Sequence, residues 1–407
     1  MGAGNTWLAR CFPHVDIGAR PVLALQVHIF ISFFRGFVPD ASMDKLELAS
    51  ILVGDHLGQV KKVFIPSGEV IILPNCAEPD KSNPVVSIEP IHQQCKNLIA
   101  TKNGNLYVYD SVQDSIEQCQ TANDSLIKAL PFAEEEVILV YDRQICFESS
   151  GDILKQKKGR IKNAKVHEDK LGVVGEDIPL RLYDLNKKSK PIFEAGQPEK
   201  NWLGIQPETY VANLEFIGSE GKHIATCSKS DSVIRLYDIR QAAKSNKPVV
   251  SINLNHEAFN EHADAGKFVA IHSTVDNNCI VVGSNVGQLI AIDLRLSAIK
   301  PGKSSKETGK KFKPRGYKVV GGFKGARGAT IKDVKIVPAQ PSGHKLISCC
   351  LDRYLRLHNF SKTNRSLDQH VYMKTKPLVC SPIFYQNSNR QPVADEKSEQ
   401  DEEESSD

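Results

Sequence analysis

Tryptophan, methionine and paired cysteines are scarce in this chain. Its 407 residues contain two Trp and three Met, and none of its ten cysteines has the Cys-x-x-Cys spacing of a structural zinc site. The apolar stretch 22–34 is interrupted by Gln26 and His28 and is shorter than the roughly 20 residues that a membrane-spanning helix needs. We therefore expect no metal, no cofactor and no membrane contact, with reduced cysteines buried as small apolar side chains.

Catalytic motifs are missing as well. The chain has no Gly-x-Ser-x-Gly and no His-Glu-x-x-His, and the glycines of 321–328 lack the Lys-Ser/Thr ending of a phosphate-binding loop. His256 and His262, close to Glu257 and Glu261, are the nearest approach to a cluster, and we interpret them as a polar connection. The sequence predicts a protein that is not an enzyme, although a site assembled from distant loops stays open.

The charge of the chain is unevenly distributed. The net charge is +4, but residues 395–407 contain eight acidic residues and one lysine, so the remainder carries +11. A basic body with an acidic tail predicts a polyanionic partner, nucleic acid first.

A repeated pattern divides the chain into three parts. Residues 1–42 show no repeat, and we interpret them as an extension that is disordered or arises from a misassigned translation start, with a targeting segment as the alternative. The repeats fill 43–385, and 386–407 form a disordered acidic tail.

The repeating unit is a short apolar strand, a turn at Gly, Asp or Asn, and a second alternating strand that usually ends in an acidic or amide residue. Seven units with no helical periodicity predict an all-β, seven-bladed propeller. The units are SILVGDHLGQVKKVFI, NLIATKNGNLYVYD, EVILVYDRQICFES, KLGVVGEDIPLRLYDL, KHIATCSKSDSVIRLYDIR, CIVVGSNVGQLIAIDLR and KLISCCLDRYLRLHNF.

Each second strand carries bulky residues on both faces. Leu106 and Val108 alternate with Tyr107 and Tyr109, as expected when a blade is sandwiched between two neighbours.

The turns of the units have their own signature. Gly58, Gly104 and Gly287 supply a positive φ at low cost, and we expect Asp231 and Asp352 to take the corresponding place and to accept hydrogen bonds from turn amides.

These features resemble WD repeats. Tyr109-Asp110, Tyr183-Asp184 and Tyr237-Asp238 resemble the Trp-Asp pair that closes the third strand of such a repeat. Ser228 and Asp231 resemble its strand Ser and turn Asp, so Ser228, Asp231 and Asp352 are predicted structural residues.

The densest positive charge lies in 299–332, which we place between blades six and seven. It has eleven basic residues against Glu307, interleaved with Phe312 and Tyr317, and it predicts contact with RNA phosphates and bases. A solvated loop without a ligand is the alternative. A second cluster lies between blades three and four, and the two form one continuous basic surface if both emerge from one face. The predicted RNA-binding residues are Lys300, Lys303, Lys306, Lys310, Lys311, Lys313, Arg315, Lys318, Lys324 and Arg327, with Lys155, Lys157, Lys158 and Arg160 in the second cluster.

Blades five to seven resemble one WD-repeat family. The runs SDSVIRLYDIR, GSNVGQLIAIDLR and LDRYLRLHNF, together with VGDHLGQVKKV in the first unit, are similar to the fungal Nop-seven-associated protein family and its animal WD-repeat counterpart. The resemblance implies a nucleolar factor on pre-60S particles that contacts pre-rRNA and other assembly factors and is released by an AAA ATPase. The resemblance also assigns roles to four residues of the last blade. It implies that Asp352 braces the turn, that Arg356 caps the blade edge, and that Arg353 and Tyr354 form a partner surface.

The sequence therefore predicts a monomeric, non-catalytic ribosome-assembly platform in the nucleus and nucleolus. The alternatives are a WD-repeat adaptor of another complex, such as a ubiquitin-ligase substrate receptor, and a propeller enzyme with acids or histidines around its central channel. Either of two strand-like runs, 370–374 and 377–384, could pair with the first blade and close the ring.

Overall fold

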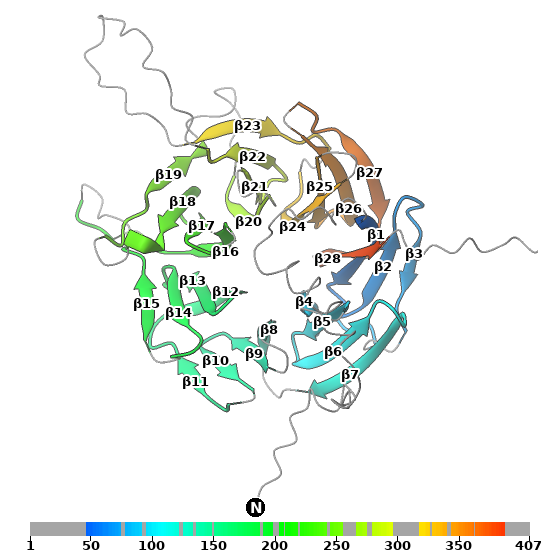
Figure 1. Ribbon diagram of the computed structural model, residues 1–407, viewed down its shortest axis with the longest axis horizontal. Helices are drawn as coiled ribbons and strands as arrows, with labels where there is room; N and C mark the ends of the chain where they lie inside the picture. Colours follow the sequence, from blue (N-terminus) through cyan, green and yellow to red (C-terminus); the bar gives the residue numbers. More distant parts are fainter. Residues whose placement is uncertain are drawn as a thin grey trace, which may run out of the picture.

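The computed structural model describes residues 46–386, apart from 75–77, 92–94, 122–124, 133–135, 149, 188–189, 198–202, 207, 219, 242–244, 255–265, 275–278, 296–316, 326–327, 340–342 and 362. In this part of the chain 28 strands form seven four-stranded antiparallel sheets. The sheets are the blades of a propeller arranged around one axis (Figure 1). The predicted all-β, seven-bladed architecture is confirmed.

Blades two to four each use four consecutive strands, of which the first lies nearest the axis and the last at the perimeter. Their strands are β4 (Val85–Ile91), β5 (Lys96–Thr101), β6 (Asn105–Asp110) and β7 (Ser115–Thr121); β8 (Leu126–Phe132), β9 (Glu136–Tyr141), β10 (Gln144–Phe147) and β11 (Ile153–Lys155); and β12 (Arg160–His167), β13 (Lys170–Glu176), β14 (Arg181–Asp184) and β15 (Pro191–Glu194).

Blades five to seven repeat this order, and a 3-10 turn, η2 (Ile239–Gln241), follows β18. Their strands are β16 (Val211–Ile217), β17 (His223–Ser228), β18 (Val233–Asp238) and β19 (Val250–Asn253); β20 (Phe268–Ser273), β21 (Cys279–Ser284), β22 (Leu289–Asp293) and β23 (Lys318–Gly322); and β24 (Ile331–Pro338), β25 (His344–Cys350), β26 (Tyr354–Phe360) and β27 (Leu367–Tyr372). No helix in the described residues is long and apolar enough to cross a membrane.

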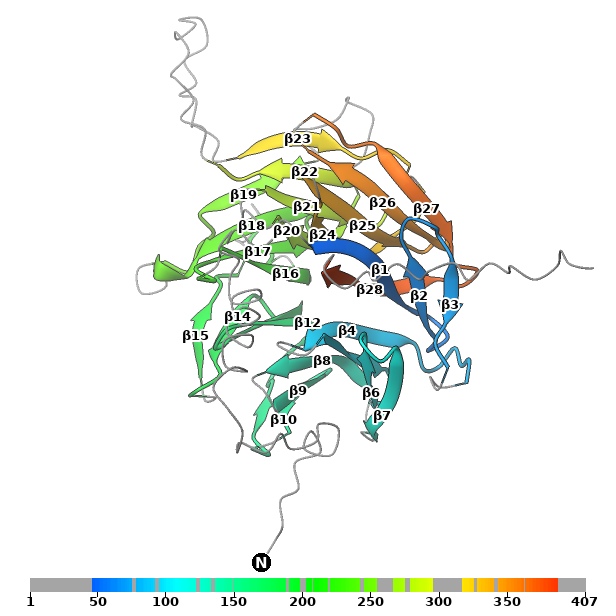
Figure 2. The ribbon, with the colours of Figure 1, turned by 45° about the vertical axis from the view of Figure 1, so that its right-hand side comes forward.

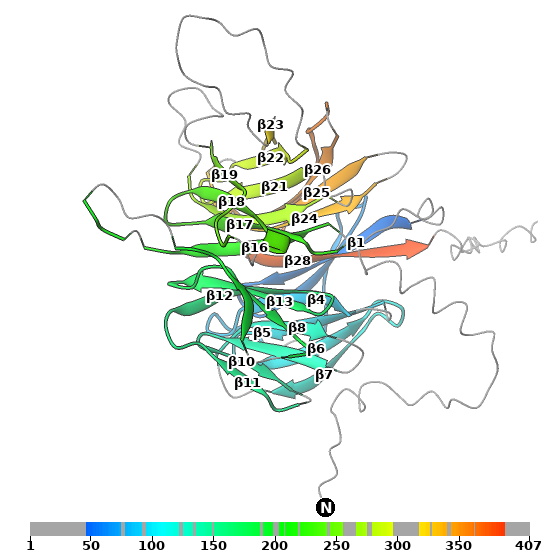
Figure 3. The same ribbon diagram turned by 60° about the vertical axis from the view of Figure 1, so that its left-hand side comes forward.

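Blade one closes the ring. Its strands are β1 (Leu46–Asp55), β2 (Val60–Phe64) and β3 (Val70–Ile72), and its innermost strand is β28 (Pro377–Gln386) from the other end of the fold. β28 pairs with β1 along nearly its whole length, and the two lie side by side in Figures 2 and 3. Of the two candidate runs, 377–384 therefore closes the ring, while 370–374 overlaps the outer strand of blade seven. Closure pairs the inner edge of β1, which would otherwise be open.

The seven predicted units coincide with the second and third strands of the seven blades. The Tyr-Asp pairs end the third strand in blades two, four and five, as expected. At these ends the Asp carboxylate accepts the N–H two residues later, at 2.8 Å for Asp110, 2.9 Å for Asp184 and 3.0 Å for Asp238. The closing acid therefore caps the turn into the fourth strand.

The core consists of seven apolar clusters, one at each interface between neighbouring blades. Leu106 and Val108 belong to the cluster between blades two and three, and Tyr107 and Tyr109 belong to the cluster between blades one and two. This division confirms the prediction that each blade buries both of its faces.

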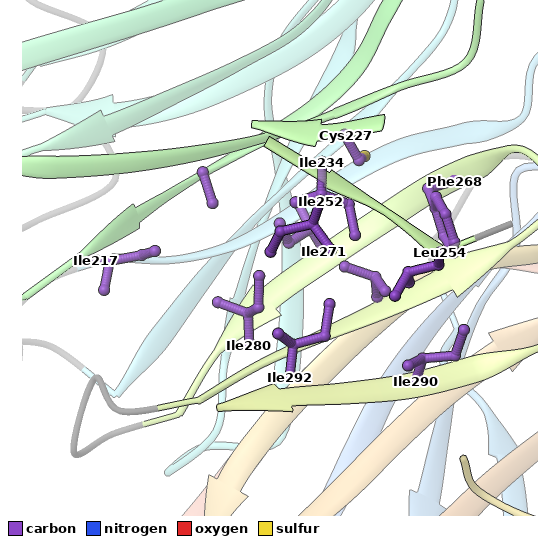
Figure 4. Close-up of a cluster of buried hydrophobic side chains, with 12 residues drawn as sticks. Ile217, Cys227, Ile234, Ile252, Leu254, Phe268, Ile271, Ile280, Ile290 and Ile292 are labelled. Atoms are coloured by element: carbon purple, nitrogen blue, oxygen red, sulfur yellow. The ribbon is translucent and has the colours of Figure 1, made fainter. Parts of the chain in front are cut away.

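Figure 4 shows one such cluster, between blades five and six. Ile217, Cys227 and Ile234 of blade five meet Phe268 and other apolar residues of blade six, including Ile280, Ile290 and Ile292. Burial of these side chains is the main force that holds neighbouring blades together, because few backbone hydrogen bonds cross between sheets.

The turns require one correction. Gly58, Gly104 and Gly287 have φ angles of 83°, 87° and 82°, as predicted. In blades five and seven, however, the residue with a positive φ is the one after the aspartate, Ser232 at 56° and Arg353 at 72°. The prediction that Asp231 and Asp352 occupy the glycine position is wrong by one residue, because these carboxylates must precede the bend to accept its amide.

Candidate functional site

The propeller has two faces of different composition. The turns between second and third strands lie beside the connections between blades, as the bonds from Gln156 N to Arg143 O and from Lys229 N to Tyr210 O show. We call this side the turn face. Connections between first and second strands and between third and fourth strands lie on the opposite face, because the strands of each sheet are antiparallel.

The second basic cluster lies on the turn face. Lys157 and Lys158 are exposed in the connection from β11 to β12, between blades three and four as predicted. Within the described residues neither has an ion-pair partner, whereas Arg160 lies 3.7 Å from Asp142 (Nε to Oδ2). Lys155, on the last position of β11, is also exposed.

Only the last part of the run 299–332, after β23, lies between blades six and seven as predicted. We call the part before β23, residues 296–316, the basic insertion. β22 and β23 are paired strands of the same blade, so 296–316 connects the third and fourth strands of blade six. The error arose because the short, glycine-containing run Lys318–Gly322 resembles a loop more than a strand. The predicted residues Lys300, Lys303, Lys306, Lys310, Lys311, Lys313, Arg315 and Arg327 lie outside the described residues.

The insertion and the second cluster are attached to opposite faces. The insertion leaves after Asp293 and returns at Lys318, on the opposite face, whereas Lys157 and Lys158 lie on the turn face. The condition for one continuous basic surface, that both segments emerge from one face, is therefore not met at these attachment points. Lys318 is exposed at the start of β23 and Lys324 is exposed two residues after its end. Tyr317 packs against the cluster between blades five and six.

Ser228 and Asp231 brace the turn of blade five. The Ser228 hydroxyl donates to Tyr210 O at 3.3 Å, and Asp231 accepts the Val233 N–H at 3.3 Å and an ion pair from Arg235. Burial raises the pKa of the Asp231 carboxyl. Hydrogen bonds from Arg235 and Ser228 lower this pKa by more than burial raises it, so the net shift is downward. These contacts are consistent with the structural role predicted for this pair.

Asp352 has the same role in blade seven. It accepts the Tyr354 N–H at 3.1 Å and pairs with Arg356, which is only 8% exposed. Arg356 therefore lies inside the blade and does not cap its edge. The predicted partner residues Arg353 and Tyr354 are neighbours on the turn face, and Arg353 is exposed.

A set of charged residues that the sequence did not reveal lies on the innermost strands. Lys128 Nζ is 2.7 Å from Glu89 Oε1, Lys165 pairs with Glu215, and His272 Nε2 is 4.0 Å from Glu215 Oε1. Each pair joins neighbouring blades. We call this set the axial charge ring, and it consists of Glu89, Lys128, Lys165, Glu215, His272, Asp333 and Lys335.

The electrostatics of the axial charge ring favour ionised carboxylates. Burial raises the pKa of Glu89, but Lys128, Lys335 and Lys165 overcome this and hold the pKa at about 2. The pKa of Glu215 is lowered for the same reason, by Lys165 and His272 against burial. A general acid needs a raised pKa, so these pairs suit the joining of blades better than proton transfer. The described residues contain no group of His, Cys, Asp and Glu that could hold a metal.

Solved structures share this architecture. The β-propeller domain of Swd1 (Cps50) from Myceliophteria thermophila matches with a TM-score of 0.52 at 8% identity, over 70% of this chain and 86% of that one. The C-terminal WD40 domain of Sif2 and the WD40 propeller of Doa1 give the same TM-score at 12% and 13% identity, over 80% and 82% of this chain and 82% and 88% of theirs. The fold is that of a WD-repeat propeller.

Among curated proteins the chain is similar to WD repeat-containing protein 74. It is 27% identical to the Bos taurus protein over 204 residues, 50% of this chain and 43% of that protein, and 26% identical to the Homo sapiens protein over 232 residues, 56% and 50%. The chain thus matches about half the length of these relatives. No family model matches the sequence.

Proposed function

We propose that this chain is a non-catalytic assembly factor of the large ribosomal subunit, which binds pre-60S particles through pre-rRNA and other assembly factors. The observation that carries the proposal is its similarity to WD repeat-containing protein 74. The resemblance of blades one and five to seven to the Nop-seven-associated protein family supports the same function. On this proposal the protein acts in the nucleolus, and an AAA ATPase acts in its release.

The distribution of charge supports an RNA partner. The chain without its acidic tail is strongly basic, and Lys157 and Lys158, which have no ion-pair partner in the described part of the chain, are exposed on the turn face. Lys318 marks the point where the basic insertion returns to the opposite face. A propeller with cations on both faces can contact two RNA segments, or one RNA and one protein, and this is the geometry of a platform between components.

The proposal is tested by RNA crosslinking in living cells combined with sucrose-gradient sedimentation of the tagged full chain. We expect sedimentation with pre-60S particles and crosslinks to precursor RNA of the large subunit, concentrated in 299–332 and at 155–160. As a control, Lys96→Ala removes a lysine outside these two segments whose charge is paired with Asp110, and it should leave the crosslinks unchanged.

Sedimentation with mature subunits, or with no ribosomal particle, contradicts the proposal. In that case the chain is better described as a propeller adaptor of another complex, and affinity purification would recover that complex without large-subunit precursors.

A further inference from the structure

Blade six covers part of the face that blade seven turns towards it. Figures 1 and 2 show β23 and β27 as neighbours on the perimeter. The His358 ring lies 5.5 Å from that of Phe323, and its Nε2 lies 2.9 Å from Lys324 O. A Cβ at Gly325 would lie 3.2 Å from Leu367, so the chain after β23 passes directly over this point.

Beyond this point the same face of the outer strand β27 is exposed. On β26 the residues that share the face of His358 are Arg356 and Tyr354, and their partners on β27 are His370 and Tyr372. His370 is exposed and Tyr372 is 49% exposed. We call Arg353, Tyr354, Arg356, His370 and Tyr372 the blade-seven patch.

The patch is built from rings and cations in mutual contact. The Tyr354 ring centroid lies 5.3 Å from that of Tyr372 and 5.7 Å from that of His370, both at tilted angles. Arg356 lies 5.2 Å from the Tyr354 centroid, and Arg353 Nη1 donates to Tyr372 Oη at 3.3 Å. Asp352, the acid next to these residues, is paired with Arg356, so the surface that remains is aromatic and cationic.

Arg356 has an unused donor. Its Nη2 binds Asp352, but its Nη1 has no hydrogen-bond partner in the described residues, although the residue is 8% exposed. A buried charged donor without an acceptor is costly. Because Nη1 is itself enclosed, a ligand on the surface would not reach it, and Arg356 supports the patch through its contact with the Tyr354 ring.

Arg353 has a backbone conformation that disfavours its own side chain. It occupies the turn position that glycine holds in blades one, two and six, with a φ of 72°. Ser232 holds the same turn position in blade five, outside the blade-seven patch, and it therefore serves as a matched control.

We propose that the blade-seven patch binds single-stranded RNA, with bases stacked on Tyr354 and Tyr372 and phosphates held by Arg353 and the neighbouring Lys324. The exposed Tyr372 ring and the half-buried Tyr354 ring, with Arg353 beside them, fit unpaired bases, whereas a duplex hides its base faces. An acidic peptide would use the cations but would leave the rings without a specific role. This inference rests on the RNA partner of the proposed function and names a site for it outside the basic insertion.

The test is fluorescence anisotropy with the purified full chain and three labelled probes: oligouridylate of about ten nucleotides, an RNA duplex of the same length, and a polyglutamate peptide. We expect the single strand to bind in preference to the other two. Tyr372→Leu should weaken it on the order of ten-fold, and Tyr372→Phe, which keeps the ring, should stay within about two-fold. Arg353→Gly should also weaken binding, while Ser232→Gly should not change it.

The outcomes separate failure of the RNA-binding patch from failure of the proposed function. Equal binding of the single strand by wild type and by Tyr372→Leu and Arg353→Gly overturns the inference, and preferential binding of polyglutamate or duplex overturns it as well. Circular dichroism of each variant separates lost binding from lost folding. If the variants behave as expected but the chain fails to sediment with pre-60S particles, the proposed function fails and the patch remains. If it sediments and the variants bind normally, only the patch fails.

Discussion

Lys61 and Asp55 form a buried ion pair within blade one, with Nζ 3.3 Å from Oδ2 and side chains that are 4% and 1% exposed. Both residues also hold the segment between β27 and β28. Lys61 donates to Met373 O at 2.8 Å, and the Thr375 hydroxyl donates to Asp55 Oδ2 at 2.7 Å. The pair therefore ties the first hairpin of the fold to the connection that leads into its closing strand.

We predict that breaking this pair destabilises the whole ring. Lys61→Met leaves the Asp55 carboxylate buried without its cation, and such a loss costs about 3–5 kcal/mol of unfolding free energy. Urea denaturation followed by circular dichroism measures it. Lys345→Met removes the exposed partner of Asp368 and should cost less than about 1 kcal/mol. Equal losses of unfolding free energy from the two substitutions would contradict a special role of the Lys61–Asp55 pair in closing the ring.

A second prediction concerns the two bracing aspartates. Asp231→Ala and Asp352→Ala each remove the acceptor of a turn amide and should cost about 1–3 kcal/mol. The loss should be greater at Asp352, because it strands an Arg356 side chain that is 10% exposed, against 17% for Arg235. Thermal unfolding of the two variants side by side gives the order, and a reversed order would show that burial of the arginine does not decide the cost.

The repeat pattern was readable from the sequence because strand alternation and turn residues are local. Leu106 to Tyr109 specify two buried faces wherever they lie in the ring, and Gly104 specifies its turn without reference to any other blade. The position of β23 was misjudged for the same reason, since Val319 and Val320 are followed by two glycines and carry little strand signal of their own.

The axial charge ring could not be predicted in this way. Glu89 and Lys128 are single polar residues in strands of different blades, and nothing local in either strand indicates that the two side chains meet. Only the packing of blade three against blade two brings them within 2.7 Å. The closing strand could not be chosen from local sequence either, because 370–374 and 377–384 both have the pattern of a strand. Only the pairing of β28 with β1 decides between them.

Thiol chemistry gives a third prediction. Burial raises the pKa of Cys227 to about 12 and that of Cys350 to about 11, and both side chains are enclosed. Cys95 is exposed, and burial of part of its thiol, with Asp110 nearby, raises its pKa more modestly. A short pulse of iodoacetamide on the native chain, followed by peptide mass spectrometry, should label Cys95 well before Cys227 and Cys350, and urea should abolish the difference. Early labelling of Cys227 would contradict the packing of blade five.

Stability should fall below neutral pH because of two histidines, the buried His358 and the half-buried His272. Burial lowers the pKa of His358, against the hydrogen bond to Lys324 O, and burial lowers the pKa of His272 against the attraction of Glu215. As the pH falls, the unfolded chain binds these protons before the folded chain does. The contribution of the two histidines to the free energy of unfolding is therefore complete above about pH 6.5 and is lost as the pH falls below it. Each histidine contributes at most about 1.4 kcal/mol between pH 7.5 and 5.5.

Urea midpoints at these two pH values measure this effect. His358→Gln retains a donor for Lys324 O and should reduce the difference between the midpoints. Ser232→Gly changes no ionisable group and should leave the difference as in the wild type. A wild-type midpoint that does not change between pH 7.5 and 5.5 would contradict the burial of these rings.

The last prediction uses salt to separate the contributions of the two faces to RNA binding. Each phosphate contact adds about 0.7 to the slope of log affinity against log salt for single strands. Replacement of Lys310, Lys311, Lys313 and Arg315 by Ala should flatten the slope measured with oligouridylate, and replacement of Lys157 and Lys158 should flatten it by a smaller, independent amount. The two effects should add, because the segments attach to opposite faces. Lys345→Ala, which removes a paired surface charge, should leave the slope unchanged. If either set alone abolished the slope, one face would account for all phosphate contacts, and the platform would have a single RNA-binding side.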